Sequence, residues 1–292
     1  MEGNPLVSVI INCFNGEEFL REAIDSVLAQ TYTHWEIVFW DNQSTDATAE
    51  IVKSYTDSRI RYYYAPNHTP LGEARNLAVE KAKGEYINFL DADDIWMPNK
   101  LEEQIKLIEP GVCEVVYSPF EIYFSNRNKK NKRMLSYYQN LYKPDPHKTT
   151  YQNLLFSNWI IFSSVIFNKS LFVKVGGVNS SFKQNEDYDV LLKCSLQTKF
   201  RVALNTKIYY RVHTNNNSLK NGDVHIYEMR TIFSQLPFSV DLEEAKAINE
   251  ARFAIYLWRK RQFATSMLHI CKLCRLKALV KIIYNRFFKH LK

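Results

Sequence analysis

Short apolar runs and helical patterns alternate over the first hundred residues of the chain. Four runs rich in β-branched and aromatic residues predict strands, at residues 6–11, 36–40, 60–64 and 86–90. Apolar residues at helical spacing predict helices between them, at residues 20–28 and 72–83. Because strands that alternate with helices form parallel sheets with right-handed crossovers, the pattern predicts an α/β fold with a mainly parallel sheet.

Polar residues follow three of these runs. They are Asn12-Cys13-Phe14-Asn15-Gly16, Asp41-Asn42-Gln43-Ser44-Thr45-Asp46 and Asp91-Ala92-Asp93-Asp94. In the second segment, Ser44 or Thr45 can cap the next helix. The carboxyl ends of parallel strands meet at one edge of a sheet, where open α/β folds bind ligands. We therefore expect Phe14, Asp41 and residues 91–94 to converge.

The acidic cluster at Asp91, Asp93 and Asp94 predicts a cation site. Three neighbouring carboxylates repel one another, and a hard divalent cation relieves that repulsion. Mg²⁺ or Mn²⁺ held by one or two carboxylates takes its other ligands from water and a substrate phosphate. An acidic turn that caps a helix over about residues 98–109 is an open alternative.

With these segments in view, the chain resembles the family 2 glycosyltransferases, which have the GT-A fold. The matching segments follow the family's order over about residues 5–220: Val7-Ser8-Val9-Ile10-Ile11-Asn12-Cys13-Phe14-Asn15, Trp40-Asp41-Asn42-Gln43-Ser44-Thr45-Asp46, Ala74-Arg75-Asn76, Phe89-Leu90-Asp91-Ala92-Asp93-Asp94, Gly176-Gly177 and Glu186-Asp187-Tyr188-Asp189. The chain departs from the family at Asn12, where proline is frequent, and at Asn42-Gln43, where Asp-Gly is frequent. These departures affect the fine geometry of the nucleotide pocket.

The resemblance implies a set of nucleotide-binding residues, namely Phe14, Asn15, Asp41, Arg75, Asp91 and Ala92. Phe14 would stack on the base, and Asp41 would accept its imide proton. Because an ionised carboxylate only accepts hydrogen bonds, it prefers uracil to cytosine and so favours UDP over CDP. Arg75 would reach the diphosphate with its planar guanidinium. Each residue has an open alternative: Phe14 could be a core aromatic, Asp41 could cap a turn, and Arg75 could be a solvated charge on a helix.

The resemblance also implies metal-binding and catalytic residues. Asp93 would be the main ligand of Mn²⁺ or Mg²⁺, assisted by Asp91, and His213 could ligate the metal or bind a phosphate. Asp187 would be the base that inverting transfer requires, with Glu186 in support. The alternatives are acidic residues that simply favour a helix N-terminus and a surface histidine at a strand end.

Composition and charge add a membrane partner to this interpretation. The chain has 292 residues, 46% of them hydrophobic, and its five scattered cysteines predict neither a disulfide framework nor a zinc site. No signal peptide or spanning stretch is expected, so we predict a cytoplasmic protein, peripheral on the cytosolic face of a membrane. No recognised nucleic-acid module is present, and no nucleic-acid partner is expected.

The C-terminal segment carries the excess of positive charge. Residues 251–292 hold 11 Lys and Arg and no acidic residue, which leaves 27 Lys and Arg against all 31 Asp and Glu in the rest of the chain. Within this segment an apolar stripe at helical spacing includes Leu273, Val280 and Phe287. Such a helix can lie on an anionic membrane, pack back on the domain, or contact a second subunit.

Together these observations predict an inverting, metal-dependent enzyme with three parts. Residues 1–220 would form the GT-A domain, with a nucleotide-binding half at 1–110 and an acceptor and catalytic half at 111–220; residues 221–292 would form a basic helical extension. A polar loop at 125–150 would face the acceptor. The enzyme would move one sugar from a UDP-sugar to a hydroxyl of a lipid-linked or cell-surface glycan, in polysaccharide or lipopolysaccharide biosynthesis. Transfer of a single sugar is expected because the Gln-x-x-Arg-Trp motif of the family's processive synthases is missing. A nucleotidyltransferase and a non-catalytic nucleotide-sugar-binding partner subunit are the alternatives.

Overall fold

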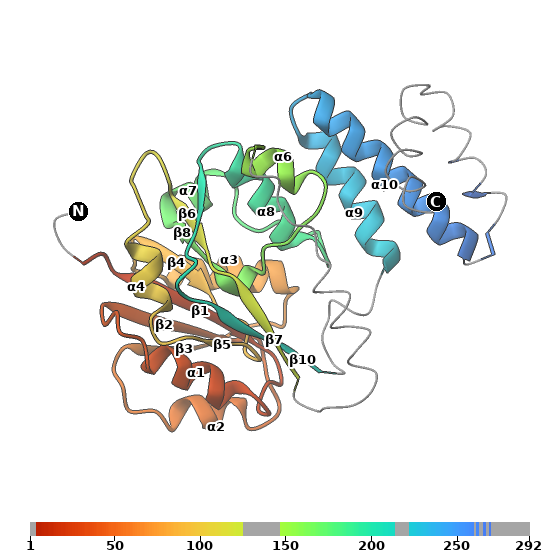
Figure 1. Ribbon diagram of the computed structural model, residues 1–292. Coiled ribbons are helices and arrows are strands. Elements are labelled where there is room, and N and C mark those ends of the chain that lie inside the picture. Colours follow the sequence, from red (N-terminus) through yellow and green to blue (C-terminus); the bar gives the residue numbers. More distant parts are fainter. Residues whose placement is uncertain are drawn as a thin grey trace.

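A computed structural model describes most of the chain (Figure 1). The described residues are 4–124, 147–213, 222–259, 261, 262, 265, 266 and 269. Most of the predicted acceptor loop at 125–150 and the whole apolar stripe from Leu273 onward therefore lie outside the described residues.

A seven-stranded sheet forms the centre of the molecule. Its strands run in the order β3 (Ile60–Tyr64), β2 (Trp35–Asp41), β1 (Val7–Cys13), β4 (Tyr86–Phe89), β8 (Val165–Asn168), β6 (Val115–Tyr117) and β9 (Phe200–Val202). The first four are parallel, β8 is antiparallel to both of its neighbours, and β9 is parallel to β6. The predicted α/β fold with a mainly parallel sheet is confirmed.

Helices cover both faces of this sheet because alternate strand residues point to opposite sides. Val9 and Ile11 pack in one core with α1 (Leu20–Leu28), α2 (Thr48–Lys53) and α4 (Lys100–Ile105). Ile10 packs in the other core, with residues of α3, α7 and α8. These helices span Leu71–Lys81, Lys169–Lys174 and Glu186–Ser195, and two short helices, α6 (Thr150–Leu154) and η1 (Phe162–Ser164), complete this side.

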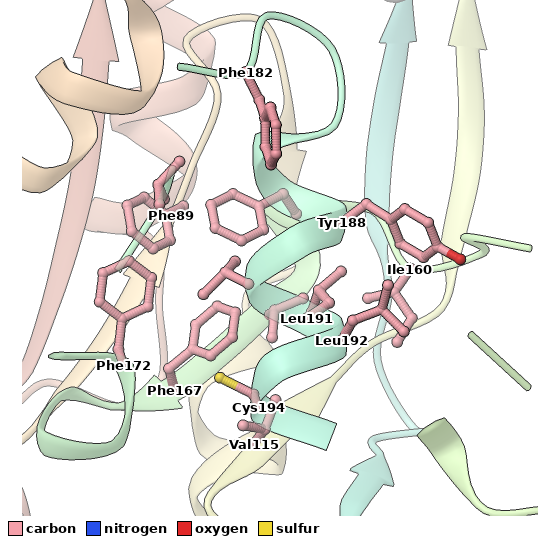
Figure 2. Packing of buried hydrophobic residues seen from close by; sticks show 14 of the residues in the cluster. Phe89, Val115, Ile160, Phe167, Phe172, Phe182, Tyr188, Leu191, Leu192 and Cys194 are labelled. Atoms are coloured by element: carbon pink, nitrogen blue, oxygen red, sulfur yellow. The ribbon is translucent and has the colours of Figure 1, made fainter. Parts of the chain in front are cut away.

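Aromatic rings at the end of β4, in η1 and in α7 form a cluster in the core that α8 also contacts. The ring of Phe89 lies 4.6 Å from that of Phe162 and 5.5 Å from that of Phe172. Figure 2 shows Phe89, Phe167 and Phe172 together beside α8, which presents Leu191 and Cys194 to the same core. The segment that follows β4 and the first turn of α8 are thus fixed relative to each other by a shared apolar core.

A small second sheet lies beside the strand ends. It consists of β5 (Ile95–Trp96), β10 (Ile208–Val212) and β7 (Phe120–Phe124), with β5 antiparallel to β10 and β10 parallel to β7. Because β5 begins directly after Asp94, its pairing with β10 brings the residue that follows β10, His213, next to the acidic cluster.

In the described residues from 222 to 259, two helices lie side by side (Figure 1). These helices, α9 (Gly222–Gln235) and α10 (Val240–Arg259), bury apolar residues in the same core as α8, among them Ile232, Phe233 and Leu242. The helical character expected after residue 220 is therefore present up to residue 259. The domain limits themselves stay a prediction.

Two local expectations are wrong. Ser44 and Thr45 do not cap α2, whose N-cap residue is Ala47. The Ser44 hydroxyl accepts from the N–H of Asn15, and the Thr45 hydroxyl donates to Asn15 Oδ1. The helix expected over 98–109 is limited to Lys100–Ile105. Among the described residues, no helix is both long enough and apolar enough to cross a bilayer.

Candidate active site

Parallel pairing brings the polar strand ends to one edge of the sheet. Cys13 of β1 lies opposite Asp41 of β2, and Ile10 of β1 lies opposite Phe89 of β4. The segments that follow these strands, with Phe14 and Asp91, therefore share that edge, as expected from their order.

Phe14 stands out from the edge with half of its surface exposed. Its exposed fraction is 51%, which excludes the alternative of a core aromatic. The ring of His68 lies 4.4 Å away at an angle of 59°, and His68 Nδ1 is 2.8 Å from the carbonyl oxygen of Asn42. An exposed aromatic face beside a second ring suits the stacking of a planar base.

Asn15 links the loops that follow β1 and β2. It adopts a positive φ of 53°, its N–H donates to Ser44 Oγ at 3.0 Å, and its Oδ1 accepts from the N–H of Thr45 at 2.8 Å. The N–H of Gly16 donates to Thr48 Oγ1 at 3.0 Å. These bonds hold Phe14 in place, and a contact from Asn15 to a nucleotide stays a prediction.

Asp41 is fully buried at the end of β2. One carboxylate oxygen accepts from the N–H of Ser44 at 2.7 Å, and the other accepts from the hydroxyl of Tyr62 at 2.6 Å. Each carboxylate oxygen has a second lone pair, so a further hydrogen bond from a base requires a path to the buried group. The predicted contact to the imide N–H stays a prediction.

The acidic cluster forms a tight turn between the two sheets. The N–H of Asp94 donates to the carbonyl of Asp91 at 3.0 Å, and Asp93 Oδ2 is 2.8 Å from His213 Nε2. Asp94 is buried and accepts from the N–H of Arg211 at 3.0 Å, whereas the Asp93 side chain keeps 29% of its surface exposed. Burial raises the pKa of Asp94 well above its ordinary value, and the carboxylates of Asp93 and Asp91 raise it further.

These residues fit a divalent cation that also binds a phosphate. Within the described part of the chain, no three acidic, His or Cys side chains are already assembled as a metal centre. Asp93 and His213 do meet at one point, and the partly exposed Asp91 carboxylate belongs to the same turn. Mg²⁺ and Mn²⁺ are commonly held by one or two carboxylates, with substrate oxygens completing the shell, so a sparse protein site suits them.

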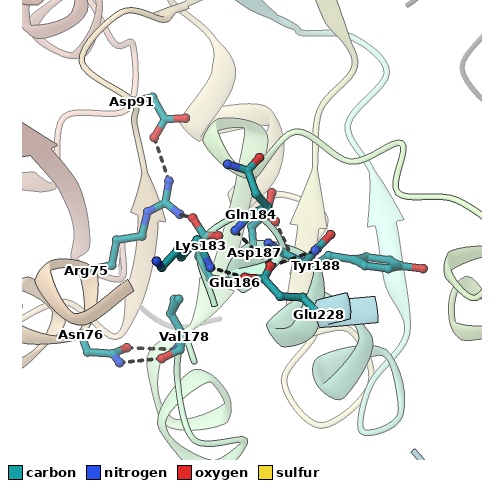
Figure 3. Close-up of polar contacts among 11 residues, drawn as sticks. Arg75, Asn76, Asp91, Val178, Lys183, Gln184, Glu186, Asp187, Tyr188 and Glu228 are labelled. Carbon is teal, nitrogen blue, oxygen red and sulfur yellow. Dashed lines mark hydrogen bonds and ion pairs between the residues drawn. The ribbon is translucent and has the colours of Figure 1, made fainter. Parts of the chain in front are cut away.

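Arg75 joins the acidic cluster to the first turn of α8. It is buried at 5% exposure, and its guanidinium contacts Asp91 Oδ1 at 3.0 Å and Glu186 Oε1 at 3.2 Å (Figure 3). The alternative of a solvated helix charge is therefore excluded. Its predicted contact with a diphosphate stays a prediction.

Asp187 lies next to Glu186 and is more exposed. Glu186 is buried, whereas Asp187 is half-buried at the rim of the site. Burial raises the pKa of Asp187 to about 7, the Glu186 carboxylate adds to the rise, and Arg75 opposes it. A carboxyl group with a pKa near neutrality is suited to proton transfer. Both acids stand in the first turn of α8, where the helix dipole also favours them.

Asn76 holds the segment that leads to α8. Its side-chain amide donates to the carbonyl of Val178 at 2.7 Å, and its Oδ1 accepts from the N–H of Val178 at 3.0 Å. Gly177, with a φ of +63°, lies so close that a Cβ there would meet Asn76 Oδ1 at 2.6 Å. A side chain larger than glycine at position 177 would therefore displace the Asn76 side chain from its bonds to Val178.

Sequence reasoning missed His68, Arg211 and the scaffolding role of Asn76. Arg211 is buried at 2% exposure and donates to the carbonyl of Asp93 at 2.8 Å, so it shapes the acidic turn. Its position two residues before His213 was the available signal. Ala92 lies in the same turn, 3.6 Å from the point where a Cβ of Gly16 would stand.

Comparison with known proteins identifies the family. A family model described as glycosyl transferase family 2 matches residues 8–172. A relative from Escherichia coli, UDP-Glc:alpha-D-GlcNAc-diphosphoundecaprenol beta-1,3-glucosyltransferase WfgD, is 34% identical over 183 residues, which are 63% of this chain and 67% of that protein.

Solved structures share the fold. S. aureus TarS 1–349 in complex with UDP matches with a TM-score of 0.68 and 18% identity, over 94% of this chain and 82% of that one. The mannosyltransferase PcManGT from Pyrobaculum calidifontis, in complex with GDP-Man and Mn²⁺, matches with a TM-score of 0.60 and 16% identity, over 98% and 82% of the two chains. The fold is that of the GT-A glycosyltransferases.

The alignments cover only part of several relatives. This chain spans 58%, 48%, 67% and 44% of the lengths of four further curated glycosyltransferases. The family model itself covers more than half of the 292 residues, and this chain belongs to glycosyl transferase family 2.

Proposed function

We propose that this protein transfers one sugar from a UDP-sugar, with inversion, to a hydroxyl of a lipid-linked or cell-surface glycan. The observation that carries the proposal is the double ion pair of Arg75 with Asp91 and Glu186. It joins the acidic cluster suited to a diphosphate and the first turn of α8, which bears Asp187. A donor site and a proton acceptor in one place are what glycosyl transfer requires.

The donor proposal is supported by the exposed ring of Phe14 and by the relatives. TarS has been crystallised with UDP and PcManGT with GDP-Man, and the Escherichia coli relative is named as a UDP-Glc enzyme. Uracil suits the chain's own Asp41, because that carboxylate can only accept a hydrogen bond when ionised. The sugar itself is not specified by these features.

Mn²⁺ or Mg²⁺ would be held by Asp93 and Asp91, with His213 beside them. When bound, the cation would supply Lewis-acid neutralisation of the diphosphate. Asp93 and His213 stand 2.8 Å apart, and Arg211 fixes the turn that carries Asp93. The protein's part is thus to keep two carboxylates close together at an accessible position.

Asp187 would act as the base. The acceptor oxygen forms a bond to the anomeric carbon, the bond from that carbon to the diphosphate oxygen breaks, and the hydroxyl proton passes to Asp187. UDP leaves with the electron pair of the broken bond. Glu186 is tied to Arg75 and is buried, so it supports the geometry and leaves the proton transfer to its more exposed neighbour.

The name of one relative and the charge of the chain support the proposed acceptor and place of action. The Escherichia coli relative is named for a GlcNAc-diphosphoundecaprenol acceptor. The 11 basic residues of 251–292 would bring the enzyme to the anionic cytosolic face of a membrane, where it would meet a lipid-linked acceptor.

A thermal-shift screen followed by a transfer assay tests this function. UDP-sugars with Mn²⁺ should raise the melting temperature more than GDP- or CDP-sugars, because a ligand of the native state stabilises it. The best donor should then release UDP when a polyprenyl-diphosphate-linked sugar is added. Binding without any UDP release, over a range of such acceptors, would instead support a non-catalytic binding subunit.

A further inference from the structure

Glu228 of α9 reaches across to the loop that precedes α8. It is buried at 8% exposure, and its carboxylate accepts from the N–H groups of Lys183 at 2.6 Å, Gln184 at 3.1 Å and Asn185 at 3.0 Å. It also accepts from Asn185 Nδ2 at 3.0 Å. Figure 3 shows this carboxylate facing the loop directly beside Glu186 and Asp187.

Three successive backbone N–H groups that point at one carboxylate form a concave anion site, filled here by a side chain of the protein itself. Hydrogen bonds to an ionised acceptor are about twice as strong as neutral ones. Four of them on one carboxylate fix the path of residues 183–185 more firmly than apolar contacts would. The loop therefore takes its conformation from a helix more than forty residues away in sequence.

The first turn of α8 has no capping hydrogen bond from its N-cap side chain. The side chain of this N-cap residue, Asn185, donates instead to Glu228 and to the carbonyl of His225 at 3.1 Å. The position where α8 begins is therefore tied to α9. The Asp187 carboxylate, two residues further on, also accepts from the N–H of Tyr188 at 2.6 Å, so its direction depends on where this first turn lies.

Packing alone does not require a carboxylate at this position. The neighbouring Met229, Ile232 and Phe233 already bury α9 against the core. Glu228 is thus an additional, polar contact directed at the loop, and it lies beyond residue 172, where the family match ends.

We infer that Glu228 is a positioning residue that orients Asp187 for proton transfer by holding residues 183–185. This inference rests on the proposed function, in which Asp187 is the base. It also makes α9 a part of the catalytic unit, although α9 belongs to the segment expected to be an appended extension.

The test compares Glu228→Gln with Glu250→Gln. Glutamine keeps the shape of Glu228 but places an NH₂ group against backbone donors, so the loop should loosen. Glu250 is a matched control: it joins α10 to α9 through two 2.6 Å contacts with Arg230 and does not contact the loop. Both variants should lose some thermal stability.

Only Glu228→Gln should lose turnover. We expect kcat to fall at least about tenfold while the UDP dissociation constant stays within about twofold, since the donor site is untouched. Glu250→Gln should keep the wild-type kcat well below its melting temperature. A Glu228→Gln variant with wild-type kcat, or with kcat and UDP affinity lost in proportion, would overturn the inference.

Hydrogen exchange separates failure of this inference from failure of the proposed function. Amides of residues 183–188 should exchange faster in Glu228→Gln than in Glu250→Gln, whether or not any sugar is transferred. Unchanged exchange there overturns the inference. A wild-type protein that transfers no sugar overturns the proposed function, and the exchange result then still decides whether Glu228 orders the loop.

Discussion

Arg75 and Glu186 are 111 residues apart in the chain and form an ion pair of 3.2 Å inside the protein. The same guanidinium contacts Asp91 at 3.0 Å, so one buried cation serves two acidic segments. A planar guanidinium can do this because its donors form a fixed fork, whereas an ammonium is a point charge. The pair therefore sets the distance between the acidic cluster and α8.

Removal of Arg75 should destabilise the fold as well as abolish transfer. Arg75→Met leaves the buried Glu186 carboxylate without its cation, which typically costs about 3–5 kcal/mol. The control is Arg201→Met, which breaks a 2.5 Å ion pair with Glu109 on the surface and should cost less than about 1 kcal/mol. Urea denaturation of both variants checks this, and equal losses would contradict the bridging role.

The rate of transfer should rise with pH up to about neutrality. Asp187, with a pKa raised by burial to about 7, must be ionised to accept a proton. At pH 5 about 1% of it is ionised, so the rate should be about a hundredfold below the plateau. Rate measurements with saturating donor from pH 5 to 9 check this. A rate that is flat over that range would contradict Asp187 as the base.

The raised pKa of Asp187 also makes the stability of the folded protein depend on pH, and stability should fall over the pH range in which the transfer rate rises. Between the unfolded pKa near 4 and the folded pKa of about 7, the folded protein holds the proton more tightly. The stability of the wild type should therefore fall as the pH rises through this window. Asp187→Asn cannot ionise, so its melting temperature relative to wild type should increase from pH 4 to pH 8 while its transfer rate stays low.

The parallel half of the sheet was predictable because its signals are local. The strand at 60–64 matches β3, the run at 36–40 is one residue shorter than β2 at each end, and the run at 86–90 is one residue longer than β4. In a parallel sheet, the ends of such strands meet by topology alone. The convergence of Phe14, Asp41 and Asp91 therefore needed no knowledge of side-chain packing.

Three further features, β5, the role of Glu228 and the burial of Asp41, depend on contacts between residues far apart in sequence, which a local sequence pattern does not predict. β5 has two residues and exists because it pairs with β10, more than a hundred positions later. A single glutamate in an amphipathic helix, such as Glu228, gives no sign that it will bind a distant loop. The buried state of Asp41, with Tyr62 on its carboxylate, was equally hidden, since its partner comes from the neighbouring strand.

Replacement of Asp93 should remove the metal-dependent part of nucleotide binding. In the wild type, EDTA should reduce the thermal shift that UDP and Mn²⁺ produce together. Asp93→Ala should show the same small shift with and without Mn²⁺. The control is Asp94→Asn, which keeps an oxygen to accept from the N–H of Arg211 and should retain the metal effect. A metal-dependent shift in Asp93→Ala would refute the assignment.

Gly177→Ala should be more destabilising than the same change at another glycine with positive φ. At Gly177 a Cβ adds the strain of the left-handed region and displaces the Asn76 side chain, with its two bonds to Val178. Gly111 has a φ of +76° but open space around it, so Gly111→Ala reports the strain alone, about 1–3 kcal/mol. The Gly177 variant should cost at least about 1 kcal/mol more, and a smaller loss there would contradict the packing argument.

The basic tail should bring the protein to anionic membranes. Each Lys or Arg near an anionic surface contributes about 1 kcal/mol, and salt screens this attraction but not the burial of apolar side chains. Full-length protein should therefore sediment with phosphatidylglycerol-containing liposomes, leave them only partly at high salt, and bind neutral liposomes less.

Deletion of residues 271–292 removes seven of the 11 basic residues and keeps the contacts of Ser266 and His269 with α10. It should abolish sedimentation and leave UDP binding intact, because every proposed ligand-binding residue precedes residue 220. A shortened protein that still sediments would refute the membrane role. One that loses UDP affinity would show that the tail belongs to the fold, and a shift from dimer to monomer would identify a subunit interface.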